Sequence, residues 1–206
     1  MSTKLHNLLF AYTMNKFSDN MEKTFYDRKK KLLSNVKGKV VEIGIGTGAN
    51  LKYYDEKIEV TCIDPNPYMQ KYLNKNSKKG NWKIKFIKGS SENIELPNNY
   101  TDYVVSTHVL CSVNDLEKSL LEIKRVLKKN GKFIFLEHVC ANTGTKLKKV
   151  QDLINPPWKY IALGCNLNRD ILSTIRKTGF KKLVFEKYNL DKGSLVKPHI
   201  QGYAIK

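Results

Sequence analysis

An acidic residue followed by three alternate glycines has the composition and spacing of a ligand-binding turn. The stretch 40–54 reads VVEIGIGTGANLKYY, in which Glu42 lies in an apolar run and Gly44, Gly46 and Gly48 follow it. Glycine tolerates positive φ and has no Cβ, so this backbone can turn sharply and approach a ligand closely. We therefore expect a small molecule to bind at this turn.

The charge of Glu42 separates the two ligand classes that use such a turn. Gly44, Gly46 and Ala49 satisfy the dinucleotide pattern G-x-G-x-x-G/A. A carboxylate at the strand end would repel a pyrophosphate, whereas the sulfonium and ammonium groups of S-adenosylmethionine are positive. The turn therefore favours a methyl donor. A nicotinamide oxidoreductase and a turn that holds no ligand are the alternatives.

A second carboxylate lies at the distance expected for ribose recognition. Asp64 follows Gly44 by twenty residues, a usual distance for a carboxylate that accepts hydrogen bonds from ribose hydroxyls. Its alternative role is to cap the turn DPNP. Both roles place the side chain at the end of the second expected strand.

Strand-like and helix-like segments alternate from Lys39 onward, which predicts parallel strands joined by right-handed crossovers. The first five expected strands are KVVEIG, IEVTCID, KIKFIKG, DYVVST and KFIFLEHV, and two more are expected at 180–187 and 200–205. Helices are expected near 49–54, 67–77, 115–128 and 168–178, with a further helical stretch after Asn142 and a loop at NPPWKY. The pattern predicts an α/β, Rossmann-like fold with a mostly parallel seven-stranded sheet and helices on both faces. A single domain is expected over 1–206, with an N-terminal helical lid or surface segment at 1–35 and a core at 36–206.

Polar residues gather at the carboxyl ends of the expected strands, where ligands of open α/β sheets bind. They are Glu42, Asp64, Thr107 with His108, and Glu137 with His138. Imidazole can accept a proton near neutral pH, so His138 and His108 are the candidate catalytic bases. The alternatives are a structural His138 that orders a loop and a His108 that forms a shelf beside the cofactor.

The charge of the chain narrows the choice of partner. The 206 residues carry a net charge of +18, almost wholly from lysine, since arginine stands only at four positions. Bidentate recognition of phosphate and guanine favours arginine, so a nucleic-acid partner is not expected. A lysine-rich helical segment at 3–35 could instead meet an anionic membrane surface peripherally, or simply cover a core or active site. No obligate protein partner is evident.

The cysteines give no sign of a metal or disulfide framework. Cys62, Cys111, Cys140 and Cys165 form no C-x-x-C pair and no repeated spacing, so no metal site is expected. The chain shows no secretory signal pattern and no apolar run near 18 residues. We therefore expect an intracellular, cytoplasmic protein.

Ordered motifs along the chain resemble a known superfamily. The stretches EIGIGTG, CIDPNP, GSSENIELP and THVL are similar to the motifs of class I S-adenosylmethionine-dependent methyltransferases. GTGANLKYY, VTCIDPNP, HVLCSV, LEHV, GCNLNRD and KPHIQGYAIK resemble more specifically the methyltransferase-like protein 7 group, the alkyl thiol methyltransferases. This resemblance covers roughly residues 14–206. Animal members of the group carry a long apolar leader, and only an amphipathic segment corresponds to it here.

The resemblance implies a bound S-adenosylmethionine, released as S-adenosylhomocysteine, and methylation of a small-molecule acceptor, in the first place a thiol. An O- or N-methyltransferase acting on a lipid, quinone or other metabolite is the alternative, and a donor-binding protein without catalysis is another. The implied donor site comprises Glu42, Gly44, Ile45, Gly46, Gly48, Asp64, Pro65, Ser90, Ser91, Glu92, Thr107 and His108. An aspartate often occupies the position of Ser90 in the superfamily, so the adenine contact here would fall to a serine hydroxyl or to Glu92.

A thiol acceptor needs little help from an enzyme to become a nucleophile. Its ordinary pKa is about 8.5, so a few per cent is thiolate at pH 7, and a nearby sulfonium favours that form. No strong base is therefore required. Aromatic residues that could form a lid over the acceptor are Tyr12, Phe17, Tyr26, Trp158 and Tyr160.

Overall fold

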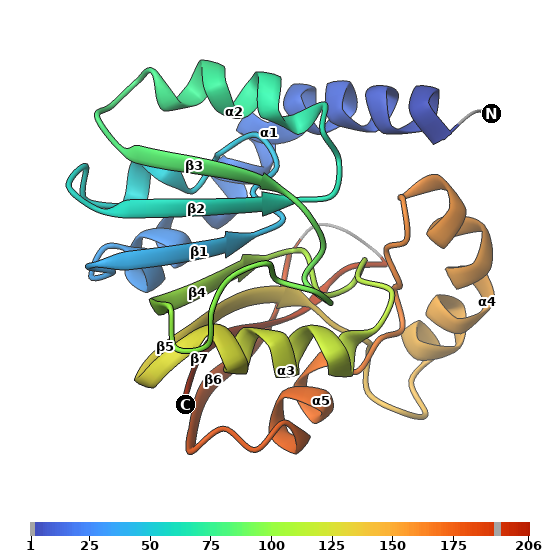
Figure 1. The fold of residues 1–206 in the computed structure, drawn as a ribbon. Helices are drawn as coiled ribbons and strands as arrows, with labels where there is room; N and C mark the ends of the chain where they lie inside the picture. The colour runs from blue at the N-terminus through green and yellow to red at the C-terminus, as the bar shows by residue number, and fades with distance from the viewer. Residues whose placement is uncertain (1–2, 192–194) are drawn as a thin grey trace.

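A computed structural model describes residues 3–191 and 195–206, and its centre is a seven-stranded sheet covered by helices on both faces (Figure 1). The strands are β1 (Lys39–Ile43), β2 (Glu59–Asp64), β3 (Lys83–Lys88), β4 (Thr101–Thr107), β5 (Leu127–His138), β6 (Lys182–Asn189) and β7 (Pro198–Ile205). Their order in space is β3-β2-β1-β4-β5-β7-β6. The first five run parallel, and β7 pairs antiparallel with both β5 and β6. The predicted mostly parallel α/β sheet is confirmed.

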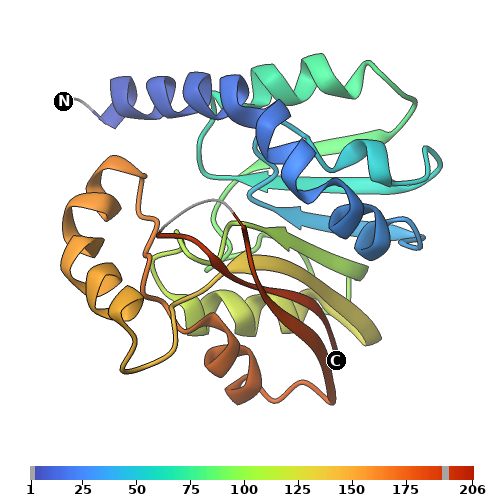
Figure 2. The same ribbon diagram turned by 180° about the vertical axis from the view of Figure 1, so that it is seen from behind.

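The alternation of side chains along the strands builds a core on each face of the sheet. Val40 and Val41 are both buried but belong to different apolar clusters, because successive strand residues point to opposite faces. One face is covered by α1 (Thr3–Leu33), the short 3-10 helix η1 (Leu51–Tyr53) and α2 (Met69–Ser77). The other is covered by α3 (Leu116–Val126) and α5 (Ile171–Lys177), and Figure 2 shows the two layers from behind. Glu42 shares the face of Val40, so its carboxylate points toward the α1 layer.

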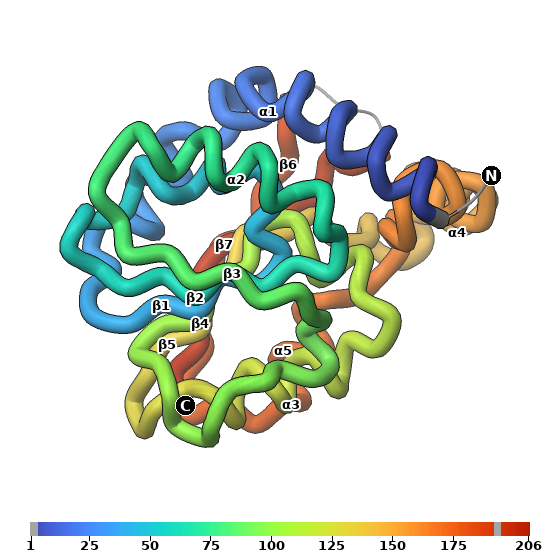
Figure 3. The backbone as a smooth tube through the Cα atoms, turned by 45° about the horizontal axis from the view of Figure 1, so that its top comes forward, coloured from blue at the N-terminus to red at the C-terminus, as the bar shows by residue number. Residues whose placement is uncertain are grey.

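Two helices lie beside the carboxyl ends of the parallel strands. The first half of α1 extends past the sheet toward α4 (Lys146–Ile161), as Figure 3 shows. The rings of His6 and Tyr160 meet there with their centroids 5.9 Å apart. No helix in the described part of the chain is both long enough and apolar enough to cross a membrane.

The structure corrects three sequence predictions about local structure. The stretch NPPWKY is helical, since α4 continues through Pro156 and Pro157 to Ile161. The predicted helix near 49–54 is only the single 3-10 turn η1. The predicted helix at 115–128 ends at Val126, because β5 begins at Leu127 and not at the predicted Lys132. The register of β5 with β4 shifts between Thr101 and Tyr103.

Candidate functional site

A cavity of about 390 Å³ opens at the carboxyl ends of β1, β2 and β4, under α1. This is the edge at which ligands of open α/β sheets bind. Its walls come from the glycine turn, the end of β2, the loop after β3 and the segment after β4. Of the predicted donor-site residues, the lining includes Gly44, Ile45, Gly46, Asp64, Pro65, Ser90, Ser91, Glu92, Thr107 and His108.

The glycine turn approaches the cavity through Gly44 and Gly46. Both have positive φ, 60° and 55°, which strains any residue with a Cβ. A Cβ on Gly44 would lie 2.4 Å from Val109 Cγ2, whereas one on Gly46 would meet nothing closer than the Gly44 carbonyl at 3.8 Å. Gly46 therefore presents open backbone to the cavity. Gly48 does not line the cavity and packs against Leu73.

Asp64 is buried at the end of β2 and already holds two backbone groups. The Gly46 amide donates to Oδ2 at 3.0 Å and the Asn66 amide to Oδ1 at 2.9 Å. Burial raises the pKa of Asp64, and these two hydrogen bonds oppose the rise. Each carboxylate oxygen has a second acceptor position, so both could also accept from a ligand hydroxyl. The turn-capping role and the ligand-binding role are thus compatible.

Glu42 stands one layer behind the cavity wall. It is 2 % exposed, does not line the cavity, and accepts hydrogen bonds from Asn50 Nδ2 and Tyr54 Oη, each at 2.7 Å. Burial raises the pKa of Glu42 to about 7, although both hydrogen bonds oppose the rise. The side chain that faces the cavity from this position is Asn50, which sequence reasoning did not single out.

The amide of Asn50 is fixed by its two neighbours. Its Nδ2 donates to Glu42 and, at 3.0 Å, to Thr107 Oγ1. Its Oδ1 is buried without a hydrogen-bond partner among the described residues. Since buried acceptors are rarely left unpaired, this oxygen marks a place for a ligand donor. The signal in the sequence was its position directly after GTGA, at the end of the glycine turn.

The loop after β3 supplies Ser90, Ser91 and Glu92, which all line the cavity. Ser91 Oγ lies 2.9 Å from Ser119 Oγ. Glu92 Oε1 accepts from the Asn114 amide at 2.7 Å. Burial tends to raise the pKa of Glu92, but its hydrogen bonds outweigh burial and lower it. Glu92 is therefore charged and holds the start of α3 beside the cavity.

His108 reaches the cavity in a left-handed backbone conformation, with φ of 58°. Its Nε2 lies 3.2 Å from Nε2 of His199, and its ring centroid lies 4.6 Å from that of Phe25. Burial, followed by the charges of His199 and His138, lowers the pKa of His108 well below its ordinary value. Burial also lowers the pKa of His199 to about 4. The pair is therefore neutral near pH 7.

Glu137 organises the segment that carries His108, a role that its position in the sequence did not reveal. Its fully buried carboxylate accepts from Ser106 Oγ at 2.5 Å, from the Val109 amide at 3.0 Å and from the Leu110 amide at 3.2 Å. Burial raises the pKa of Glu137 to about 7, and these donors oppose the rise. The carboxylate thus ties the end of β5 to the loop after β4.

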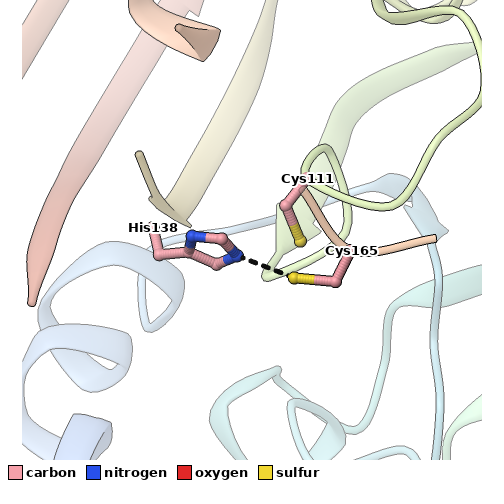
Figure 4. A group of neighbouring side chains, drawn as sticks. All are labelled: Cys111, His138 and Cys165. Carbon is pink, nitrogen blue, oxygen red and sulfur yellow. Dashed lines mark hydrogen bonds between the residues drawn. The ribbon is translucent and has the colours of Figure 1, made fainter. Parts of the chain in front are cut away.

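His138, the other candidate base, does not line the cavity. It is 5 % exposed, and its Nε2 lies 3.3 Å from Cys165 Sγ, with Cys111 beside them (Figure 4). A hydrogen bond with Cys111, and then contacts with His138, lower the pKa of Cys165 to about 4, whereas the same bond and burial raise that of Cys111. These three residues come from three separate segments, which explains why cysteine spacing gave no sign of them.

The roof of the cavity is α1, but not through the aromatic residues expected to form a lid. Tyr12, Phe17, Tyr26 and Tyr160 are 52 %, 56 %, 44 % and 70 % exposed, and neither they nor Trp158 line the cavity. The side chains of α1 that do so are Asn7, Phe10, Met14, Ser18, Met21, Glu22 and Lys29. The helix therefore covers the site with the face opposite to its exposed aromatic residues, and that face carries both polar and apolar side chains.

Comparison with known proteins places this geometry among methyl-transferring enzymes. The family model described as "Methyltransferase domain" matches residues 41–135. Human thiol S-methyltransferase TMT1A is 36% identical over 209 aligned residues, which cover 96% of this chain and 86% of the human protein. Rat thiol S-methyltransferase TMT1B is 35% identical over the same shares of the two chains.

Solved structures share the fold at low sequence identity. A Thermotoga maritima methyltransferase, described as a possible histamine N-methyltransferase, superposes with a TM-score of 0.62 at 21% identity, over 95% of this chain and 99% of the other. A chain in the solved complex between the Haloferax volcanii activator Trm112 and a putative methyltransferase superposes with a TM-score of 0.70 at 15% identity. The superposition covers 95% of this chain and 96% of the other. These likenesses concern the fold alone.

Proposed function

Because this chain belongs to the thiol S-methyltransferase group of the class I S-adenosylmethionine-dependent methyltransferases, we propose that it methylates a small-molecule thiol. The family and the fold make S-adenosylmethionine the cofactor. The observation that carries the choice of acceptor is the similarity to thiol S-methyltransferases along 96% of the chain. The cavity under α1 supports it, because a thiol needs no strong base and the one imidazole among the described residues that line the cavity, that of His108, is neutral near pH 7.

The residues around the cavity fit the donor. Its ammonium group is a hydrogen-bond donor, and the unpaired Oδ1 of Asn50 is a buried acceptor in the wall. The negative charge of Glu42 behind Asn50 would favour that cation. Gly44, Ile45 and Gly46 would hold the methionine portion beside this pair. Gly48 would act indirectly, by keeping the turn packed on Leu73.

The rest of the donor would follow the cavity toward the loop after β3. Asp64 would accept from the ribose hydroxyls, next to Pro65. Ser90 and Ser91 would meet the adenine, and Glu92 would hold the α3 segment against it. Thr107 would contribute by orienting Asn50. Each assignment predicts a loss of donor affinity when the side chain is removed.

The bound donor supplies a methyl group on a positive sulfur. The protein then has to align a thiolate in line with it and exclude water, and alignment alone can provide a large share of the acceleration. Met14 and Met21 of α1 supply an apolar cover for the acceptor. His108 is the candidate base that reaches the cavity, and its ring, which is neutral near pH 7, does not repel the sulfonium while the donor is bound. His138 would act only through other residues.

Donor binding and a methylation panel test the proposal. Isothermal titration should give saturable binding of S-adenosylmethionine and S-adenosylhomocysteine. A panel of sulfide, alkyl thiols, phenols and amines should then show turnover on the thiols. Binding with turnover only on phenols or amines would move the acceptor to oxygen or nitrogen. Absence of binding would contradict the donor site itself.

We also propose peripheral contact with anionic membranes through α1 and α4. Leu153 and Ile161 of α4 are 79 % and 71 % exposed, and Phe17 of α1 is 56 % exposed. The net charge of +18 adds long-range attraction to anionic lipid. The protein should sediment with phosphatidylserine vesicles at low salt, and I161D should weaken this more than L121D, which alters an equally apolar exposed site on α3. Failure to sediment at low salt would contradict the proposal.

A further inference from the structure

Three side chains from distant segments meet behind the wall of the cavity with the donor set of a transition-metal site. Cys111 lies in the segment after β4, His138 ends β5, and Cys165 lies between α4 and α5. One potential ligand atom from each lies within 4.8 Å of the other two. Figure 4 shows both sulfur atoms and the His138 imidazole directed toward one another. Such a convergence of two thiols and an imidazole is the ligand chemistry that zinc prefers.

The spacing of these atoms suits a tetrahedral ion. Zinc takes thiolate sulfur at about 2.3 Å and imidazole nitrogen at about 2.0–2.1 Å, so two ligands of one ion lie roughly 3.5–3.8 Å apart. His138 Nε2 and Cys165 Sγ are 3.3 Å apart, already close to that value. The other ring nitrogen, Nδ1, is buried without a partner within the described ranges, so Nε2 is the atom that the fold directs to a neighbour.

The surroundings of the cluster also favour a bound ion. Cys111 is 3 % exposed and His138 is 5 % exposed, while Cys165 is half-buried and leaves one side open. Neither of the other cysteines joins the cluster, and none of the four forms a disulfide. A divalent ion with two thiolates and a neutral imidazole has no net charge. Burial of the loaded site is therefore cheaper than burial of two free thiolates.

We propose that Cys111, His138 and Cys165 form a Zn²⁺ site with three protein ligands and one open coordination position. Binding forms two Zn–S bonds and one Zn–N bond, breaks any S–H bond still present on the two sulfurs, and releases that proton to solvent without any redox change. The ion would fasten together the three segments that carry these residues. An imidazole bound to zinc cannot accept a proton, so this assignment leaves His108 as the candidate base.

Metal titration of the reduced full-length chain tests the site independently of methyl transfer. Stripped protein should take up one equivalent of Zn²⁺ in competition with a chromophoric chelator near neutral pH. C111S, C165S and H138Q should each weaken the affinity by at least about 100-fold, because each removes one of only three protein ligands. C140S is the matched control and should bind like the wild type, since Cys140 lies outside the cluster.

A spectroscopic measurement separates ligand loss from misfolding. Co²⁺ in place of Zn²⁺ should give a thiolate-to-cobalt charge-transfer absorption in the wild type and C140S that is absent from C111S/C165S. Far-ultraviolet circular dichroism should show the double variant folded. Failure of the reduced wild type to bind stoichiometric Zn²⁺, or unchanged binding by the folded double variant, would overturn the proposal.

Discussion

The side-chain amide of Asn50 donates a 2.7 Å hydrogen bond to the buried carboxylate of Glu42, and only Asn50 of the two reaches the cavity. The negative charge and the direct contact with the cavity therefore belong to two different side chains. Glu42 supplies negative charge from behind the wall, while Asn50 offers the unpaired Oδ1. A cationic ligand can therefore be recognised without bringing the carboxylate into contact with it.

Removal of the Asn50 amide should weaken donor binding. In N50A the ammonium of the donor loses its acceptor and Glu42 loses a buried partner, so the Kd for S-adenosylmethionine should rise roughly 10- to 100-fold, as expected for a hydrogen bond to a charged group. Isothermal titration measures this. N74A, at an exposed site on α2, should leave the Kd unchanged. Equal affinities for N50A and wild type would contradict the assignment.

The raised pKa of Glu42 should make donor binding depend on pH. The carboxyl group has a pKa of about 7 in the free protein. A bound cation favours its ionised form, so binding releases a proton and affinity should rise as pH increases through 7. Titrations between pH 5.5 and 7.5 keep the α-amino group of the donor largely charged, because its ordinary pKa is about 7.7–8.0. In E42Q this pH dependence should be much flatter, and an unchanged slope would exclude Glu42 as its source.

The ion pair between Lys29 and Glu22 should stabilise the attachment of α1. Both side chains are buried, and Glu22 also accepts from Tyr53 Oη at 2.9 Å. K29M removes the buried partner of Glu22 and leaves the carboxylate with Tyr53 and with the half-exposed Lys52, whose Nζ lies 2.8 Å away, so the free energy of unfolding should fall by about 2 kcal/mol. Urea unfolding measures the loss. K30M changes the exposed neighbour and should cost far less; similar losses for both would show that the buried pair contributes little.

The sequence was sufficient to predict the edge of the sheet at which the cavity opens, but not which side chains line the cavity. Near-continuous apolar segments separated by helical ones determine a parallel sheet, and the carboxyl ends of its strands follow from that topology. Whether Glu42 or Asn50 faces the cavity depends on how the turn folds back on the strand. That packing involves Val109 and Leu73, which are distant in sequence.

Two other features depend on tertiary packing that no local pattern contains. Prolines normally end a helix, because proline has no N–H to donate to the carbonyl four residues earlier. Pro156 and Pro157 nevertheless lie inside α4, at exposed positions. The carbonyls of residues 152 and 153, which lose these hydrogen bonds, lie on an exposed stretch of the helix where water can reach them. The Cys111, His138 and Cys165 cluster arises because the sheet order places β5 next to β4. Spacing rules for metal sites detect ligands that are close in sequence, so they do not detect this arrangement.

Substitutions on the two faces of α1 should differ in their effect on the KM of the acceptor. Met14 lines the cavity, whereas Phe17, on the same helix, is 56 % exposed. M14A removes apolar contact worth about 1 kcal/mol, so the acceptor KM should rise roughly fivefold. F17A should leave the KM near the wild-type value. The reverse order of effects would show that the face carrying Phe17 closes over the acceptor during turnover.

The contribution of His108 should depend on the acidity of the thiol acceptor. Asparagine tolerates the positive φ of this position, so H108N removes the imidazole with little backbone strain. An acidic aromatic thiol is already ionised and should lose less than about threefold in kcat, whereas an alkyl thiol that needs a base should lose roughly 100-fold. Steady-state rates with both thiols at pH 7, with donor Kd measured in parallel, make the comparison. Equal losses for the two thiols would mean that His108 positions the reactants and does not accept the proton.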